Sequence, residues 1–133
     1  MNQVFIQMSG APGSGKTTIA NAISERIKAV IIDHDVTKSA LLNAGVPYLY
    51  IECRLENLDE LDRRLRSRPR RPTQLTGVYS PPPKGSGRAL SGEEVFRDWI
   101  RNMKRPAADY LVLDTARPVE TCVEEAVAYI SAN

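Results

Sequence analysis

The sequence predicts an α/β fold with three layers, in which a short, mainly parallel sheet of about four strands is covered by helices on both faces. Four short runs of apolar residues are nearly continuous, as expected of strands that are buried on both sides. The segments between these runs carry apolar residues at helical spacing, and alternation of strands with helices favours a parallel sheet. With 133 residues, the chain is long enough for one domain spanning residues 1–133 and hardly for two.

The predicted strands are short and end in residues that suit a ligand site. They span residues 4–9, 29–32, 48–53 and 110–114. Ligands of open parallel sheets bind beyond the carboxyl ends of the strands. Glycine or polar residues stand at all four of these ends, so we expect them to converge on one edge of the sheet. They are Gly10, Asp33, Asp35, Arg54 and Asp114.

Helix signals fill the intervals between the strands. Ile19, Ile23 and Ile27 recur on one helical face after the first strand. Further helices are predicted to start at a capping residue or at a proline suited to the first turn. These starts are Asp35, Asn57, Ser91 and Pro118. Glu60, three residues after Asn57, completes a pattern similar to a capping box.

Residues 69–92 differ from the rest of the chain in composition. Proline, glycine, serine and arginine dominate there, with Pro81–Pro83 and Gly85–Gly87 at the centre. Such a segment has too little apolar surface to bury, so the sequence predicts a flexible loop. A basic loop that follows a helix is typical of a lid, which closes over a substrate and excludes water.

The most specific pattern lies between the first strand and the first helix, where Gly10 to Thr17 reads G-x-x-x-x-G-K-[ST]. Glycines adopt backbone angles barred to other residues, so successive N–H groups can face inward around an anion. The positive end of the helix dipole falls at the same place. The predicted phosphate-binding residues are Gly10, Ala11, Pro12, Gly13, Ser14, Gly15, Lys16, Thr17 and Thr18.

Two side chains of this stretch have distinct predicted roles. Lys16 supplies an ammonium to the β- and γ-phosphates of a nucleotide, and Thr17 supplies a hydroxyl to Mg²⁺. The pattern therefore predicts binding of a nucleoside triphosphate. The alternative is a glycine-rich turn between strand and helix that binds nothing.

Two carboxylates follow the second predicted strand. Beside a γ-phosphate, a carboxylate accepts the proton of an acceptor hydroxyl or holds Mg²⁺ through water. We assign the base to Asp35, which is nearer the helix start, and the metal to Asp33. The alternative for Asp35 is a helix cap and nothing more. His34, between them, receives no role because a lone histidine is more often a surface or packing residue.

Arginines form the third group of candidates. Arg64 and Arg68 lie one helical turn apart and lead into residues 69–92. Guanidinium groups stabilise the charge that spreads over a transferring phosphoryl group, so these two are predicted to contact phosphate. The alternative is a solvated charge run, which we favour for Arg70 and Arg71 because prolines flank them. Arg117 is a candidate to stack on an adenine ring.

Bulk properties exclude several classes of function. The formal net charge of +2 provides few counter-charges for a nucleic-acid backbone, so that partner is not expected. No apolar stretch approaches the ~20 residues that cross a bilayer, and the first strand begins too early to leave room for a signal peptide. Cys53 and Cys122 lack metal or redox spacing and indicate buried thiols of a cytoplasmic protein. Trp99 is expected in the core.

The residues from Met8 to Thr17, together with Ile32–Asp35, resemble a group of P-loop kinases. This group is similar to chloramphenicol phosphotransferase, zeta toxin and polynucleotide 5′-kinase. Further matches to its uncharacterised members are Tyr50–Arg54, Arg64–Arg68 and Thr73-Gln74. The resemblance covers almost the whole chain and implies the P-loop NTPase fold of nucleoside kinases, with ATP as donor, Mg²⁺, and an acceptor hydroxyl near the two aspartates.

The resemblance also implies roles for single residues. Asp35 matches the general base, and Arg64 and Arg68 match the arginines of the lid. Lys38 stands where an arginine is common. Members of the group usually carry several tens more residues before Tyr48, including helices over the acceptor pocket and a strand whose final aspartate assists the metal.

In this chain only Gly45-Val46-Pro47 bridges the helix at Leu41-Leu42 and the strand at Tyr48. Helix-to-strand loops of about 2–6 residues are common, so the connection is allowed. By this resemblance, we expect the shorter chain to have one fewer metal-site acid and a shallower acceptor site than the members of the group.

The combined hypothesis is a kinase that moves the γ-phosphoryl group of ATP to a hydroxyl of a small molecule. Asp35, Lys16, Arg64 and Arg68 are its candidate catalytic residues, and Thr17 and Asp33 its metal ligands. Two alternatives stay open: a nucleotide-binding module without turnover, and a simple ATPase. The sequence identifies neither the acceptor nor the oligomeric state.

Overall fold

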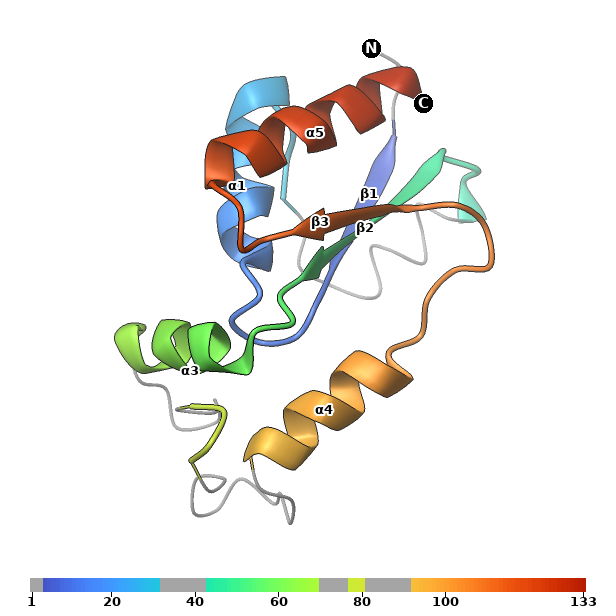
Figure 1. The fold of residues 1–133 in the computed structure, drawn as a ribbon. Helices are drawn as coiled ribbons and strands as arrows, with labels where there is room; N and C mark the ends of the chain where they lie inside the picture. Colours follow the sequence, from blue (N-terminus) through green and yellow to red (C-terminus); the bar gives the residue numbers. More distant parts are fainter. Residues whose placement is uncertain (1–3, 32–42, 70–76, 81–91) are drawn as a thin grey trace.

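One parallel sheet organises the molecule (Figure 1). The computed structural model describes residues 4–31, 43–69, 77–80 and 92–133. The strands are β1 (Phe5–Ser9), β2 (Tyr48–Arg54) and β3 (Leu111–Asp114), and their order in the sheet is β1-β2-β3. Ser9 lies opposite Glu52, and Arg54 lies opposite Asp114. The carboxyl ends of all three strands therefore meet at one edge, as the sequence predicted.

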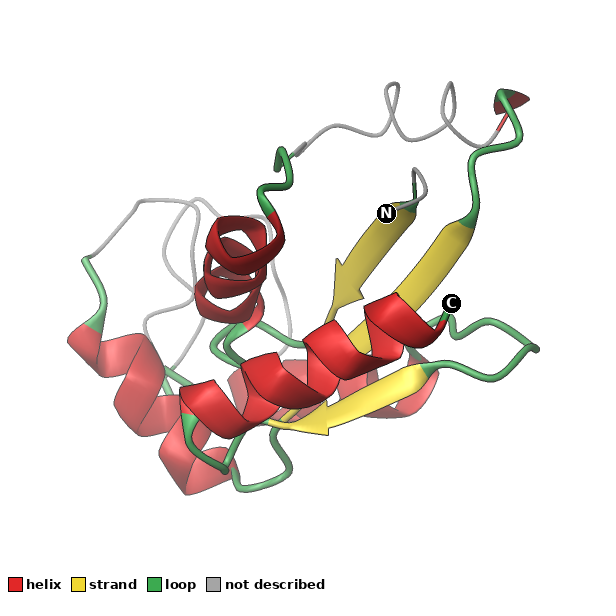
Figure 2. Cartoon of the chain, turned by 90° about the horizontal axis from the view of Figure 1, so that it is seen from above, coloured by secondary structure: helices red, strands yellow, loops and turns green. Residues whose placement is uncertain are grey.

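Helices lie on both sides of this sheet. They are α1 (Lys16–Ile27), α3 (Leu58–Ser67), α4 (Gly92–Asn102) and α5 (Val119–Ala132). α1 and α5 pack together over one face, whereas α3 and α4 lie on the other side, toward the carboxyl ends of the strands (Figures 1 and 2). None of the helices in the described residues is long and apolar enough to span a membrane.

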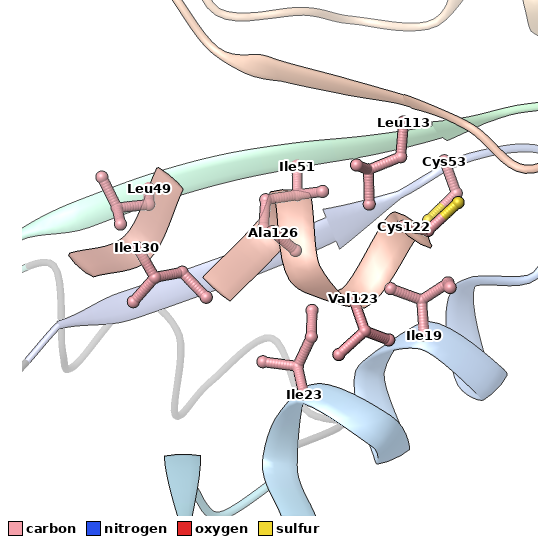
Figure 3. Close-up of a cluster of buried hydrophobic side chains, with 10 residues drawn as sticks. All are labelled: Ile19, Ile23, Leu49, Ile51, Cys53, Leu113, Cys122, Val123, Ala126 and Ile130. Atoms are coloured by element: carbon pink, nitrogen blue, oxygen red, sulfur yellow. The ribbon is translucent and has the colours of Figure 1, made fainter. Parts of the chain in front are cut away.

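The larger hydrophobic core lies between the sheet and the pair α1 and α5 (Figure 3). β2 contributes alternate residues, as a strand with one face on the core must. The fully packed members are Ile19, Ile23, Leu49, Ile51, Cys53, Leu113, Cys122, Val123, Ala126 and Ile130. Both cysteines are free thiols, and burial raises the pKa of Cys53 to about 12. The expectation of buried cysteines is confirmed, and their reduced state stays a prediction.

The predicted strand at 29–32 does not form in the part that the structure describes. Ala29 to Ile31 follow the left-handed C-cap of α1 at Lys28 and pair with no described strand. Val30 is 85% exposed and Ile31 is 51% exposed. A short apolar run becomes a strand only where a neighbour pairs with its backbone, and the sheet supplies none here. The sheet therefore has three described strands rather than about four.

The predicted start of α3 is confirmed at its cap. The side chain of Asn57 accepts hydrogen bonds from the backbone N–H groups of Asp59 at 3.0 Å and Glu60 at 3.1 Å. The second half of a capping box would direct Glu60 back to the cap. Among the described residues, the Glu60 carboxylate instead binds Arg63 and Arg64.

The segment predicted as a flexible loop contains a packed part. Val78 is fully buried in a second hydrophobic cluster between α3 and α4. Its N–H donates to the carboxylate of Asp62 at 2.8 Å, and the hydroxyl of Tyr79 donates to Asp59. Residues 77–80 therefore attach the 69–92 segment to both helices. The rest of that segment lies outside the described residues, so its flexibility stays a prediction.

A buried carboxylate joins the end of α4 to the sheet. Glu52 is 2% exposed and binds Arg54 and Arg105, whose guanidinium also donates to the carbonyl of Ile100. We expect Glu52→Ala to lower the free energy of unfolding by about 3 kcal/mol, because two arginines would lose the carboxylate that compensates them. Urea unfolding measures this change.

The matched control is Glu93→Ala. It removes an exposed ion pair between Glu93 and Arg97, which both lie on α4. Exposed pairs contribute about 0–1 kcal/mol, so this variant should unfold close to the wild-type urea concentration. Equal losses in the two variants would contradict a stabilising role for the buried network.

Candidate phosphate-binding site

Residues 10–15 form the turn between β1 and α1. Gly10, Gly13 and Gly15 have φ angles of +146°, +81° and +97°, which side-chain-bearing residues rarely adopt. The N–H of Ser14 donates to the carbonyl of Ala11 at 3.0 Å and closes the turn. The sequence thus has glycine where the turn requires it, and α1 begins directly at Lys16 as predicted.

The ammonium of Lys16 lies within this turn. It donates to the carbonyl oxygens of Gly10 at 2.6 Å and Ala11 at 3.1 Å. Burial lowers the pKa of Lys16, a nearby Cys53 opposes that change, and the positive charge of Arg68 adds to it. The loop therefore keeps a partly desolvated cation next to its amide groups.

A cavity of about 740 Å³ opens beside the loop. Its described lining comes from the loop, α1, the end of α3, α4, the turn after β3 and α5, and it contains four cationic side chains and no carboxylate. The lining residues are Pro12, Gly13, Gly15, Lys16, Thr17, Thr18, Ile19, Arg64, Arg68, Trp99, Thr115, Arg117, Val119 and Cys122. A concave site whose described lining carries cations and no carboxylate favours an anionic ligand.

α3 brings two arginines to this cavity. Arg64 donates from Nη2 to the carbonyl of Thr115 at 2.6 Å and from Nε to Glu60 at 3.0 Å. Arg68 is the C-cap residue of α3, directly after its last residue, Ser67. The two side chains that the sequence placed one turn apart thus reach the same cavity as Lys16, and their contact with phosphate stays a prediction.

Arg117 approaches the cavity from the segment after β3. It donates from Nε to the carbonyl of Asp114 at 3.2 Å and from Nη2 to Glu125 at 2.6 Å. Hydrogen bonding to Glu125 raises the pKa of Arg117. Arg117 lines the same cavity as the loop, and its predicted contact with a nucleotide base stays a prediction.

The remaining predicted residues divide into two groups. Ala11 and Ser14 are 6% and 1% exposed, so they contribute backbone to the turn. The Oγ of Ser14 is buried and has no hydrogen-bond partner among the described residues. Asp33 and Asp35 lie outside the described residues, so the roles of base and metal ligand stay predictions.

Sequence reasoning missed Thr115. This residue is 5% exposed, and its hydroxyl donates to the carbonyl of Ser14 at 2.5 Å, which ties the loop to the end of β3. Its carbonyl holds Arg64. The available signal was its place directly after a strand end. Trp99, expected in the core, packs edge-on against Phe96 and also lines the cavity.

The described residues meet some of the requirements for binding a nucleotide together with a magnesium ion. Gly13 and Gly15 line the cavity and carry no Cβ that would keep a phosphate away, and Thr17 brings a hydroxyl to the same cavity. Mg²⁺ commonly uses one or two protein ligands together with phosphate oxygens, so it does not require an all-protein cage. Within the described ranges, no group of three or more His, Cys, Asp or Glu side chains could hold a metal ion.

The fold is similar to that of two solved kinases, and the described residues form one strand fewer than predicted. A sugar kinase from Janibacter sp. HTCC2649 matches with a TM-score of 0.58 and 15% identity, over 97% of this chain and 95% of that one. A gluconokinase from Sinorhizobium meliloti 1021 matches with a TM-score of 0.57 and 14% identity, over 98% of this chain and 93% of that one. No protein-family model matches the sequence. No curated protein matches it either.

Proposed function

We propose that this chain binds ATP with Mg²⁺ and transfers the γ-phosphoryl group to a hydroxyl of a small molecule. The observation that carries the proposal is the cavity itself, in which a glycine-rich turn faces Lys16, Arg64, Arg68 and Arg117 without a described carboxylate in the lining. A nucleoside triphosphate carries the negative charge that such a set of cations matches.

Each part of the site has a role in this reaction. The loop amides and Lys16 bind the β- and γ-phosphates, while Arg64 and Arg68 stabilise the charge on the equatorial oxygens during transfer. Thr17 and Asp33 would hold Mg²⁺, which would supply positive charge to offset that of the phosphates. Asp35 accepts the proton of the acceptor hydroxyl as its oxygen bonds to the γ-phosphorus and the bond from that phosphorus to the β-phosphate oxygen breaks.

Binding and turnover are tested separately. Calorimetric titration with ATP and Mg²⁺ measures binding, and the fluorescence of Trp99, the single tryptophan of the chain, gives a second signal from the same cavity. ADP release is then followed with a panel of hydroxyl acceptors. Sugars and sugar acids come first, because the structural neighbours are a sugar kinase and a gluconokinase. Acceptor-dependent ADP release supports the kinase, and its absence across the panel contradicts it.

A nucleotide-binding module without turnover is the second candidate. Residues 43–47 lead directly into β2, and β1, which carries the loop, has β2 as its one partner among the described strands. The group that the sequence resembles carries more residues before β2, so the resemblance implies a shallower acceptor site here. ATP binding without ADP release would favour the module, whereas ADP release that needs no acceptor would indicate an ATPase.

The affinity for ATP should fall as the pH rises. The fall should begin at a lower pH than it would if Lys16 had the pKa of an ordinary lysine. Burial holds the pKa of Lys16 in the free protein below that of an ordinary lysine side chain, so the ammonium loses its proton at a lower pH. The protonated form binds phosphate, and affinity is therefore present below this pKa and lost as the pH rises through it. Calorimetry from pH 7 upward measures the profile.

Lys16→Arg is the control for this pH dependence, because a guanidinium stays protonated over the same range. Its binding, although weaker in absolute terms, should be flat with pH. A wild-type profile as flat as that of the variant would mean that Lys16 does not titrate in the binding step.

A further inference from the structure

The carboxylate of Glu60 binds Arg64, one of the arginines that line the cavity. Its Oε1 accepts a hydrogen bond from Nε of Arg64 at 3.0 Å. The guanidinium of Arg63 binds the same carboxylate from Nε at 2.7 Å and from Nη2 at 2.6 Å. The Arg63 side chain is 67% exposed, whereas that of Arg64 is 26% exposed and lines the cavity. One acid thus holds a surface arginine and a cavity arginine.

A second contact fixes the direction of Arg64. Its Nη2 donates to the carbonyl oxygen of Thr115 at 2.6 Å, so both Nε and Nη2 are engaged. The remaining nitrogen, Nη1, lies next to the loop, since a Cβ placed on Gly15 would be 3.8 Å from it. Two attachments on a planar group leave its third nitrogen facing the turn.

We propose that Glu60 is a positioning residue for polyphosphate binding: together with the Thr115 carbonyl, it holds Arg64 so that Nη1 faces the phosphate-binding turn. This inference rests on the proposed function, because it requires a polyphosphate in that turn. An arginine that is held in place before the ligand arrives loses less side-chain entropy when it binds.

The charge of Glu60 allows a positioning role to be distinguished from a purely electrostatic effect on ATP affinity. Hydrogen bonds from Arg63 and then Arg64 lower the pKa of Glu60 to about 2, so its carboxylate is charged at neutral pH. A negative charge near a polyphosphate site repels the ligand directly. Its removal should therefore tighten binding through space, whereas loss of the positioned arginine should weaken it. The two effects have opposite signs.

The decisive experiment titrates ATP with Mg²⁺ into the wild type, Glu60→Ala and Glu60→Gln. Glu60→Ala should bind ATP about tenfold more weakly, the loss expected when one charge-assisted hydrogen bond is no longer preformed. Glu60→Gln removes the charge but keeps an oxygen acceptor for Nε of Arg64, so it should retain more affinity than the alanine variant. Circular dichroism and urea unfolding establish that each variant is folded.

Two further variants test whether the effect passes through Arg64. Arg63→Gln is the matched control, because it breaks the surface contact to the same acid and should leave affinity within about twofold of wild type. In an Arg64→Gln background, Glu60→Ala should cause no additional loss. An additional tenfold loss there would mean that Glu60 acts by another route and would overturn the inference.

The outcomes separate this inference from the proposed function. A wild-type chain that does not bind ATP overturns the proposed function and the positioning role with it. A wild-type chain that binds ATP, with Glu60→Ala and Glu60→Gln binding equally well or more tightly, overturns the positioning role alone. Weaker binding by the alanine variant, partial retention by glutamine and no effect in the Arg64→Gln background support it.

Discussion

Lys16→Ala should abolish ATP binding while leaving the protein folded. The Lys16 ammonium lies inside the turn on the carbonyls of Gly10 and Ala11, where a polyphosphate would also be held. A hydrogen bond to a charged group contributes about 1.5–3 kcal/mol, so two such bonds to phosphate oxygens predict a loss of about a hundredfold or more in affinity. Calorimetry measures the affinity, and quenching of Trp99 fluorescence checks it independently.

Lys104→Ala is the matched control for this change. Lys104 is exposed, does not line the cavity, and makes its described contact through its backbone carbonyl, which accepts from Tyr50. Lys104→Ala removes the same charge from the protein as Lys16→Ala. Its ATP affinity therefore measures the effect of net charge alone. Equal affinities for Lys16→Ala and the wild type would show that the turn does not bind polyphosphate through this lysine.

The fold was predictable where a local pattern is sufficient to define an element. The run at Tyr48–Cys53 became β2, and the amide-capping side chain of Asn57 starts α3 as its sequence indicated. The run at Ala29–Ile32 has the same apolar character, yet its described residues form no strand. The sequence pattern indicates which secondary structure a segment favours locally. A strand also needs a neighbouring strand to pair with, and that depends on the arrangement of the whole sheet.

In the candidate site, too, the features set by consecutive residues were predictable, whereas contacts between residues far apart in the sequence were not. The turn at residues 10–15 was predictable because its backbone conformation depends on consecutive residues. The link from Thr115 to the loop and to Arg64 joins residues 101 and 51 positions apart, and no local pattern reports it. The sequence likewise suggested that Glu60 caps a helix, while its carboxylate binds arginines in the folded chain.

Gly10→Ala is expected to disrupt both the fold of the loop and its binding of ATP. Gly10 has a φ of +146°, and a Cβ at this position would collide with the carbonyl oxygen of Cys53 and with Oγ of Ser14. Backbone strain and overpacking together predict a loss of about 2–3 kcal/mol in the free energy of unfolding. Because β2 cannot move away from its neighbours, the loop must shift, and its amides leave the positions that surround a phosphate.

Gly45→Ala separates the collision from the strain. Gly45 also has a positive φ, of +72°, but a Cβ there would meet nothing within 4 Å. This variant should lose about 1 kcal/mol of stability and keep its affinity for ATP. If Gly10→Ala lost no more stability than Gly45→Ala and bound ATP equally well, close approach of the loop to β2 would be unnecessary for binding. The contrast between two strained glycines therefore tests the packing of the loop against β2, which the sequence motif alone does not reveal.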